Sequence, residues 1–221
     1  MVQRLGARGW VVAVLSLTVL LSTGASLQPE IALRITQNAD PTESDGVGPY
    51  CSLGETHWLR IFDLDDDHGL VGDFCVDSLR FPVHATSSSG LQPLTVNTWC
   101  WRPSLPLGYD SFDLQDSITF KQPDADGEFF RHAVGGCCDA DHEDLVIEIA
   151  TAPCPSADDD CMMALGQDTD HYAFPPWYTW AEPCGIFDDE WFPSSVLELP
   201  SDIIIVVYGT GIQPTIGRAP D

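Results

Sequence analysis

Short segments in which apolar and polar residues alternate recur along the chain from residue 57 onward, separated by turns rich in Asp, Gly, Pro and Ser. Alternation with a period of two is the pattern of a strand with one buried face. We therefore predict strands in six segments: 57–64, 73–83, 94–101, 117–121, 145–149 and 203–208. Because each strand has one apolar face, two sheets must pack face to face to bury these faces.

Helical signals are few. The chain holds 17 Pro and 18 Gly residues, and only residues 158–165 are compatible with a helical turn or two. We predict an all-β fold, a single antiparallel β-sandwich of the jelly-roll-like type, stapled by disulfides and joined by long irregular loops. The sandwich domain is placed at residues 51–221. Residues 26–50 are interpreted as a flexible lead-in with one short strand at 31–35.

The first 25 residues have the features of a secretory signal peptide. Arg4 and Arg8 give a basic start, residues 11–21 are an apolar run too short to span a bilayer, and small residues end at Ala25. We expect cleavage near Ala25 and a mature protein that is secreted, extracellular, periplasmic or held at the cell surface. No membrane insertion is expected after signal cleavage.

Charge narrows the classes of partner. Beyond residue 25 the chain has seven basic and 34 acidic residues, a net charge of −27. Such a charge repels nucleic acids and anionic membranes and favours divalent cations. Nucleic acid is therefore excluded as an expected partner.

The chain has eight cysteines: Cys51, Cys75, Cys100, Cys137, Cys138, Cys154, Cys161 and Cys184. In an exported chain they predict up to four disulfides, which 105 connectivities would satisfy. Neighbouring positions favour three pairings: Cys51 with Cys184, Cys75 with Cys100, and Cys154 with Cys161. The adjacent Cys137 and Cys138 are expected to take separate partners.

An acidic segment between the first two predicted strands is a candidate calcium site. Asp63, Asp65 and Asp67 alternate, Asp73 follows, and calcium prefers several oxygen ligands on a loop. The segment is not an EF-hand loop, because its sixth position is His68 and its twelfth is Phe74. The alternative is a solvated turn between two strands. Calcium is the one cofactor expected, and otherwise none.

Other clusters of metal-ligand residue types point more strongly to ordinary structure. Asp124, Asp126 and Glu128 surround Gly127 and are interpreted as a solvated hairpin turn. The segments 132–142 and 158–160 also concentrate such residues. The first has spacings that fit neither structural nor catalytic zinc, and the second is interpreted as solvated carboxylates.

Aromatic residues gather in the last quarter of the chain. Trp177, Tyr178 and Trp180 are candidates for a platform on which sugar rings stack. The alternative is that these rings pack a proline-rich loop against the sandwich. No Gly-x-Ser-x-Gly, His-Glu-x-x-His, P-loop or dinucleotide motif is present, and we predict no catalytic residue.

The order of segments resembles an uncharacterised β-sandwich module of secreted bacterial proteins, often attached to larger exported chains. The segments that carry the resemblance are HWLRIFDL (57–64), FCVDSLRF (74–81), LTVNTW (94–99), LVIEI (145–149), LGQD (165–168), WYTW (177–180) and CGI (184–186). The chain departs from it by additional cysteines and a more acidic first loop. The resemblance implies export and a sandwich, and it implies no catalytic residues.

These observations favour a secreted, non-catalytic binding, accessory or adhesion-type module, stabilised by calcium and binding a glycan or another surface protein. One alternative is an extracellular glycan-active hydrolase that uses acidic residues, whose spacing in space a sequence does not reveal. Another is a structural surface component that assembles through its acidic face and cations.

Overall fold

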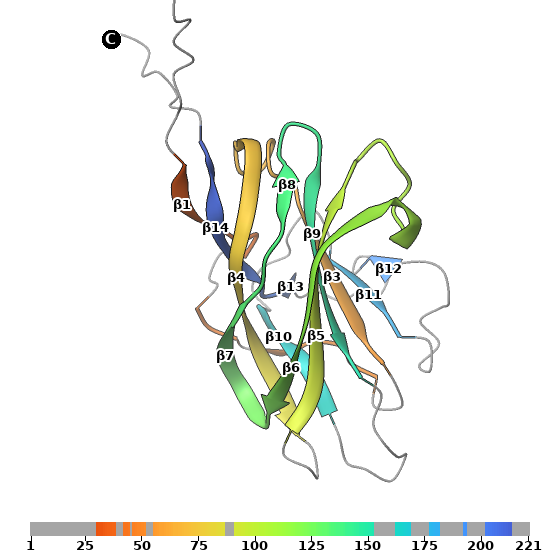
Figure 1. The fold of residues 1–221 in the computed structure, drawn as a ribbon. Coiled ribbons are helices and arrows are strands. Elements are labelled where there is room, and N and C mark those ends of the chain that lie inside the picture. The colour runs from red at the N-terminus through yellow and green to blue at the C-terminus, as the bar shows by residue number, and fades with distance from the viewer. Residues whose placement is uncertain are drawn as a thin grey trace, which may run out of the picture.

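The computed structural model describes residues 30–38, 42–44, 46–51, 55–86, 91–152, 162–168, 177–181, 192–193 and 202–213. These residues form two antiparallel sheets packed face to face, with no α-helix among them. The fold is therefore the β-sandwich that the alternating pattern predicted. In Figure 1, β1, β14 and β4 belong to one layer, and β3, β9 and β11 to the other.

The two sheets differ in size. Sheet I has eight strands: β1 (Ile31–Ile35), β2 (Gly46–Val47), β4 (Val71–Thr86), β7 (Ala125–Ala133), β8 (Cys137–Asp139), β10 (Met162–Asp168), β13 (Asp202–Ile203) and β14 (Val206–Ile212). Sheet II has six strands: β3 (His57–Phe62), β5 (Leu91–Trp101), β6 (Phe112–Pro123), β9 (Asp144–Thr151), β11 (Tyr178–Trp180) and β12 (Phe192–Pro193). A short 3-10 turn, η1 (Tyr109–Ser111), lies between β5 and β6.

The strands pair in a nested order. β1 pairs with β14, β3 with β9, β4 with β7, and β5 with β6. The nested pairs are then joined by β4 beside β14 in sheet I and by β5 beside β9 in sheet II. One long folded ribbon rolled onto itself in this way is an eight-stranded jelly roll. The remaining strands, apart from β2 and β8, lie between β9 and β14 in the chain and extend both sheets.

The core lies between the two sheets and follows from strand alternation. On β9, Leu145, Ile147 and Ile149 face inward, whereas Val146 and Glu148 face outward from the sandwich. Trp58 and Phe62 of β3 are also fully buried in this core. All six predicted segments overlap strands, because their inward residues fill one continuous interior.

One inward position carries a charge. Arg60 is 0% exposed, and its guanidinium donates in a bidentate arrangement to Asp202 Oδ1 and Oδ2 at 2.6 and 2.7 Å. The same guanidinium donates to the carbonyl oxygens of Ile203 at 2.5 Å and Gln37 Oε1 at 2.6 Å. Because Arg60 lies on sheet II and Asp202 on sheet I, this ion pair joins the two sheets.

Two disulfides are formed by the adjacent cysteines of β8. Cys137 bonds to Cys75 on the neighbouring strand β4, and Cys138 bonds to Cys100 on β5 of the opposite sheet. Successive side chains of a strand point to opposite faces, so neighbours must find different partners. The prediction of separate partners is confirmed, and the expected pairing of Cys75 with Cys100 is wrong.

Cys51 is disulfide-bonded as well, and no described cysteine is free. Its expected partner Cys184 and the expected pair of Cys154 with Cys161 lie outside the described residues. Disulfides are characteristic of an oxidising compartment. Within the described part of the chain, no helix is long and apolar enough to span a membrane.

The turn that leads into β8 depends on close contact with sheet II. Gly135 N donates to Asp116 Oδ2 at 2.7 Å, and Thr98 Oγ1 donates to the Gly135 carbonyl oxygen at 2.7 Å. At Gly136 the φ angle is +115°, and a Cβ would lie 2.7 Å from Gln115 Cβ. Only glycine fits this position, which brings β8 within disulfide distance of β5.

Two predicted boundaries are wrong. Residues 31–35 form β1, which pairs along its whole length with β14, and β2 pairs with β10. The sandwich therefore starts before residue 51 and includes part of the predicted lead-in. Residues 162–165, which we considered helix-compatible, belong to β10 and pair with β4. Pairing with a waiting sheet edge outweighs the weak local preference of such a segment.

Candidate functional site

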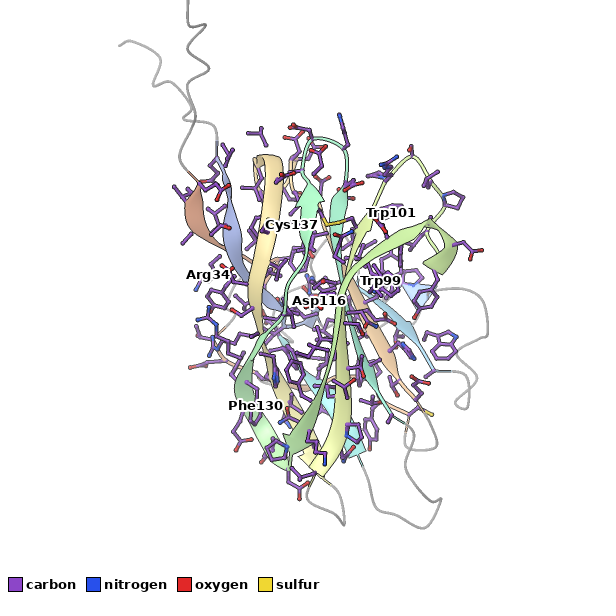
Figure 2. The ribbon with its side chains drawn as sticks, viewed as in Figure 1. Arg34, Trp99, Trp101, Asp116, Phe130 and Cys137 are labelled. Carbon is purple, nitrogen blue, oxygen red and sulfur yellow. A yellow bond between two sulfur atoms is a disulfide. The ribbon has the colours of Figure 1, made fainter. Side chains whose placement is uncertain are left out.

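The outer face of sheet II is unusually apolar for a surface. A second cluster of buried residues covers it: Leu59, Ile61, Phe112 and Val146. Four partly buried side chains pack against this cluster: Trp99, Trp101, Leu107 and Tyr178. In Figure 2, Trp99 and Trp101 lie on the side of the sandwich away from Arg34 of sheet I. A half-exposed aromatic face of this kind is a candidate binding surface.

A buried carboxylate organises this face. Glu148 of β9 is 1% exposed, and four side chains donate to it. His57 Nδ1 and the Tyr109 hydroxyl donate to Oε1, the first at 2.7 Å. Asn97 Nδ2 and Trp99 Nε1 donate to Oε2 at 2.8 and 3.1 Å. The four donors come from β3, β5 and η1, which surround the central strand β9.

The register of sheet II explains how these residues meet. Glu148 lies directly opposite Asn97 on β5 and opposite Leu59 on β3. His57 and Trp99 are two residues away on the same faces of their strands, within reach across the sheet. Tyr109 reaches over from η1, and its ring lies 5.9 Å from the Trp99 ring.

The hydrogen bonds fix the ionisation of the site. Burial alone would raise the pKa of Glu148, but the bonds from His57, Tyr109 and Asn97, and the charge of His57, hold this pKa below its usual range. Burial and the neighbouring Glu148 carboxylate raise the pKa of Tyr109. Glu148 is therefore an anion with both oxygens fully engaged, which orients its donors and leaves no lone pair for a ligand.

His57 connects the buried carboxylate to the surface. Its Nε2 lies 3.1 Å from Oε1 of the exposed Glu55, on the side opposite Glu148. Trp180 of β11 packs edge-on against the imidazole, with ring centroids 4.5 Å apart. Tyr109, 45% exposed, also borders the imidazole. The accessible part of the site consists of these aromatic edges and polar atoms.

The predicted aromatic platform is only partly present. Trp177 is 1% exposed and belongs to the core between the sheets, so placing it on a surface platform was wrong. Inward and outward positions alternate along β11, which leaves Tyr178 and Trp180 partly exposed on the outer face of sheet II. Burial raises the pKa of Tyr178. A ligand-binding role for Tyr178 and Trp180 remains a prediction.

Sequence reasoning missed the centre of this site. His57, Asn97, Trp99, Tyr109 and Glu148 come from four separate segments, and their meeting depends on the order of strands. One local signal was available: Glu148 interrupts the apolar run 145–150. A single acid inside a buried strand needs donors to compensate its burial.

The predicted calcium residues lie on and after the turn that joins β3 to β4. Asp63 Oδ1 accepts a hydrogen bond from the Asp66 backbone N at 2.8 Å, which stabilises the turn. Asp73 lies on β4, where it pairs with Asp139. Among the described residues, no group of three or more His, Cys, Asp or Glu is arranged to hold a metal ion. Calcium binding by Asp63, Asp65, Asp67 and Asp73 stays a prediction.

A fifth carboxylate faces this turn. Phe62 pairs with Leu145, so Asp144 at the start of β9 lies beside the turn. Burial raises the pKa of Asp144 to about 7, and the charges of Asp63, Asp67 and Asp66 raise it further in the same direction. The folded protein therefore binds more protons here than the unfolded chain between pH 4 and 7, and this group's contribution to stability falls as pH rises through that window.

Asp144→Asn is expected to raise the free energy of unfolding at pH 8 by about 1 kcal/mol, a modest gain because the half-buried group is screened by solvent. At pH 4 the gain should vanish, since the native carboxyl is then protonated. Urea unfolding at both pH values measures the effect, with the exposed Asp110→Asn as the charge-matched control. An equal gain at both pH values would contradict repulsion as the cause. Calcium should abolish the gain at pH 8 if the turn binds it.

Comparisons with known proteins give little. No family model matches the chain, and no curated protein matches it. Among solved structures, the chain is similar to a chain of infectious bursal disease virus Gx strain, at 11% sequence identity and a TM-score of 0.27. The likeness covers 86% of this chain and 37% of that chain. It carries no argument about function.

Proposed function

We propose that this protein is a secreted, non-catalytic binding module that holds a glycan on the outer face of sheet II. One observation carries the proposal: the buried Glu148 carboxylate fixes His57, Asn97, Trp99 and Tyr109 at a half-exposed aromatic face. Fixing these groups lowers the entropy that they lose when a ligand binds.

The chemistry of the face suits a sugar. Flat rings offer apolar contact to the C–H faces of a pyranose, and polar atoms between them orient the hydroxyl groups. Tyr109, Trp180 and Trp99 supply the rings. His57 Nε2 and the Glu55 carboxylate supply polar atoms at the rim. This combination favours a neutral or hydroxyl-rich ligand over a fully apolar one.

Export is part of the proposal. The basic start, the apolar run and the small residues before position 26 support a signal peptide. The disulfides of Cys75 and Cys100 support an oxidising destination. The resemblance to modules attached to larger exported bacterial chains supports an accessory or adhesion-type role.

A glycan-active hydrolase is the second candidate, since Glu55 and Glu148 flank His57. A retaining or inverting glycosidase needs one carboxyl group that is protonated at working pH. The lowered pKa of Glu148 keeps it ionised, and its oxygens are fully engaged. These properties favour binding over hydrolysis. Turnover of any glycan, lost in Glu55→Gln, would overturn this preference.

A glycan array probed with the intact mature protein tests the proposal. We expect binding of at least one neutral glycan, weakened about tenfold or more by Trp180→Ala, the loss of roughly one aromatic contact. Tyr109→Phe keeps the ring but removes the hydroxyl that donates to Glu148, and should weaken binding less than Tyr109→Ala.

The matched control is Phe129→Ala, which removes a half-exposed ring from the outer face of sheet I, where it lies under Arg80. It should leave neutral-glycan binding unchanged. Absence of any neutral-glycan binding, or equal binding by folded Trp180→Ala and the unaltered protein, would overturn the proposed function. Thermal unfolding of each variant separates loss of binding from loss of fold.

A further inference from the structure

The outer face of sheet I concentrates positive charge in a chain that is otherwise strongly acidic. The described residues include six of the nine Lys and Arg residues. Arg60 is buried in the core, and Arg102 pairs with Glu143 at 3.3 Å. Three of the other four, Arg34, Arg80 and Arg131, lie on this one face. We call it the arginine face.

Strand register places the three arginines in a row. Arg34 of β1 lies opposite Tyr208 of β14, and Tyr208 lies opposite Ser78 of β4. Directly opposed residues of antiparallel strands share a face. Arg131 of β7 reaches back across β4, donating from Nε to Ser78 Oγ at 2.8 Å. The row therefore crosses β1, β14, β4 and β7.

Aromatic rings hold two of the guanidinium groups flat on the sheet. The Arg131 guanidinium carbon lies 4.1 Å from the centre of the Tyr208 ring, and that of Arg80 lies 4.1 Å from the centre of the Phe129 ring. Cation–π stacking restricts these long side chains and leaves the N–H edges available to acceptors. The face is thus ordered before any ligand arrives.

Two features of the arginine face call for an anion. Arg80 and Arg131 are directly opposed across β4 and β7, and like charges in that position destabilise a sheet. Neither Arg34 nor Arg131 forms an ion pair with a described residue. An anion that bridges these guanidiniums would relieve the repulsion and form bidentate hydrogen bonds.

We propose that the arginine face binds a linear acidic polysaccharide through its carboxylate groups. The planar guanidinium fork matches a carboxylate, and a row across four strands suits an extended chain. A bulky polyanion or a second copy of this chain would bring its charge against the rest of a protein of net charge −25. A slender chain confined to the row stays more than a screening length of about 8 Å from most of those acids.

This surface is separate from the glycan site proposed above. Figure 2 shows Arg34 and Trp99 on opposite sides of the sandwich. The two proposals therefore make independent predictions. Trp180→Ala should leave acidic-polysaccharide binding unchanged, and changes to the arginine face should leave neutral-glycan binding unchanged.

Binding of a labelled hexameric oligouronate to the intact mature protein, followed by fluorescence anisotropy at 50 mM salt, tests the inference. We expect the double variant Arg34→Gln/Arg131→Gln to weaken binding at least tenfold. Arg131→Lys keeps the charge but loses the fork and should give an intermediate loss. Raising the salt to 500 mM should weaken binding by the unaltered protein, because screening shortens the reach of charge.

Arg102→Gln is the matched control, since it removes one exposed charge from outside the arginine face. The inference is overturned if the unaltered protein does not bind the oligouronate at 50 mM salt. It is also overturned if the double variant binds as well as Arg102→Gln. Should the double variant unfold, the single exposed change Arg34→Gln, on an edge strand, decides the question with an expected loss of about threefold.

Discussion

Replacing Arg60 with Met is expected to lower the free energy of unfolding by about 3–5 kcal/mol, because it leaves the buried Asp202 carboxylate without its partner. Asp202 is 1% exposed and receives two of its hydrogen bonds from the Arg60 guanidinium. Asn38 Nδ2, at 3.4 Å from Oδ2, is too distant to replace them. Urea unfolding at pH 7 measures the loss.

The double variant Arg60→Met/Asp202→Leu separates the value of the ion pair from the penalty of breaking it. A buried ion pair replaced by apolar side chains of similar volume is often neutral or stabilising. We therefore expect the double variant to regain most of the stability lost in Arg60→Met. A double variant less stable than Arg60→Met would show that the pair itself, and not the orphaned charge, supplies the stability.

Removing the disulfide between the sheets is expected to have the second-largest effect. Cys100→Ala/Cys138→Ala should lower the free energy of unfolding by about 2–4 kcal/mol, since the bond closes a long loop in the unfolded chain. The bond spans 38 residues and joins β5 of sheet II to β8 of sheet I. Both cysteines are buried, so their truncation also opens space in the core.

The comparison variant is Cys75→Ala/Cys137→Ala. That bond spans 62 residues, but it joins β4 to β8, which are already paired in one sheet. On loop length alone, its removal should cost slightly more. We expect it to cost less, because Cys137 is exposed and leaves no buried space. Thermal unfolding under non-reducing conditions measures both, and a larger loss for Cys75→Ala/Cys137→Ala would show that loop entropy outweighs core packing.

The strands that sequence reasoning found are those with a clear difference between their faces. On β9 the apolar positions 145, 147 and 149 are all buried, and the alternation was visible. β7 was missed, because Phe129 and Phe130 are adjacent and both of its faces are only partly buried. A strand on a sheet edge shows less contrast between its two faces, so its pattern is weaker.

The candidate site was harder to predict than the fold. Trp180 was named as a ligand contact from its residue type, and the structure places it beside His57. The same reasoning placed Trp177 on the surface, although it lies in the core. Residue type indicates what a side chain can bind, but the parity of its position in β11 decides whether it meets solvent or the interior.

By itself, the sequence determined the class of fold, the presence of disulfides and the separate partners of Cys137 and Cys138, because alternation and adjacency are local properties of a strand. Only the tertiary structure decided which strands pair, and therefore that Glu148 meets its four donors and that three arginines align on sheet I. Strand order depends on contacts between residues far apart in the chain. A change of one residue in register would exchange the buried and exposed faces of a strand and disperse both groups.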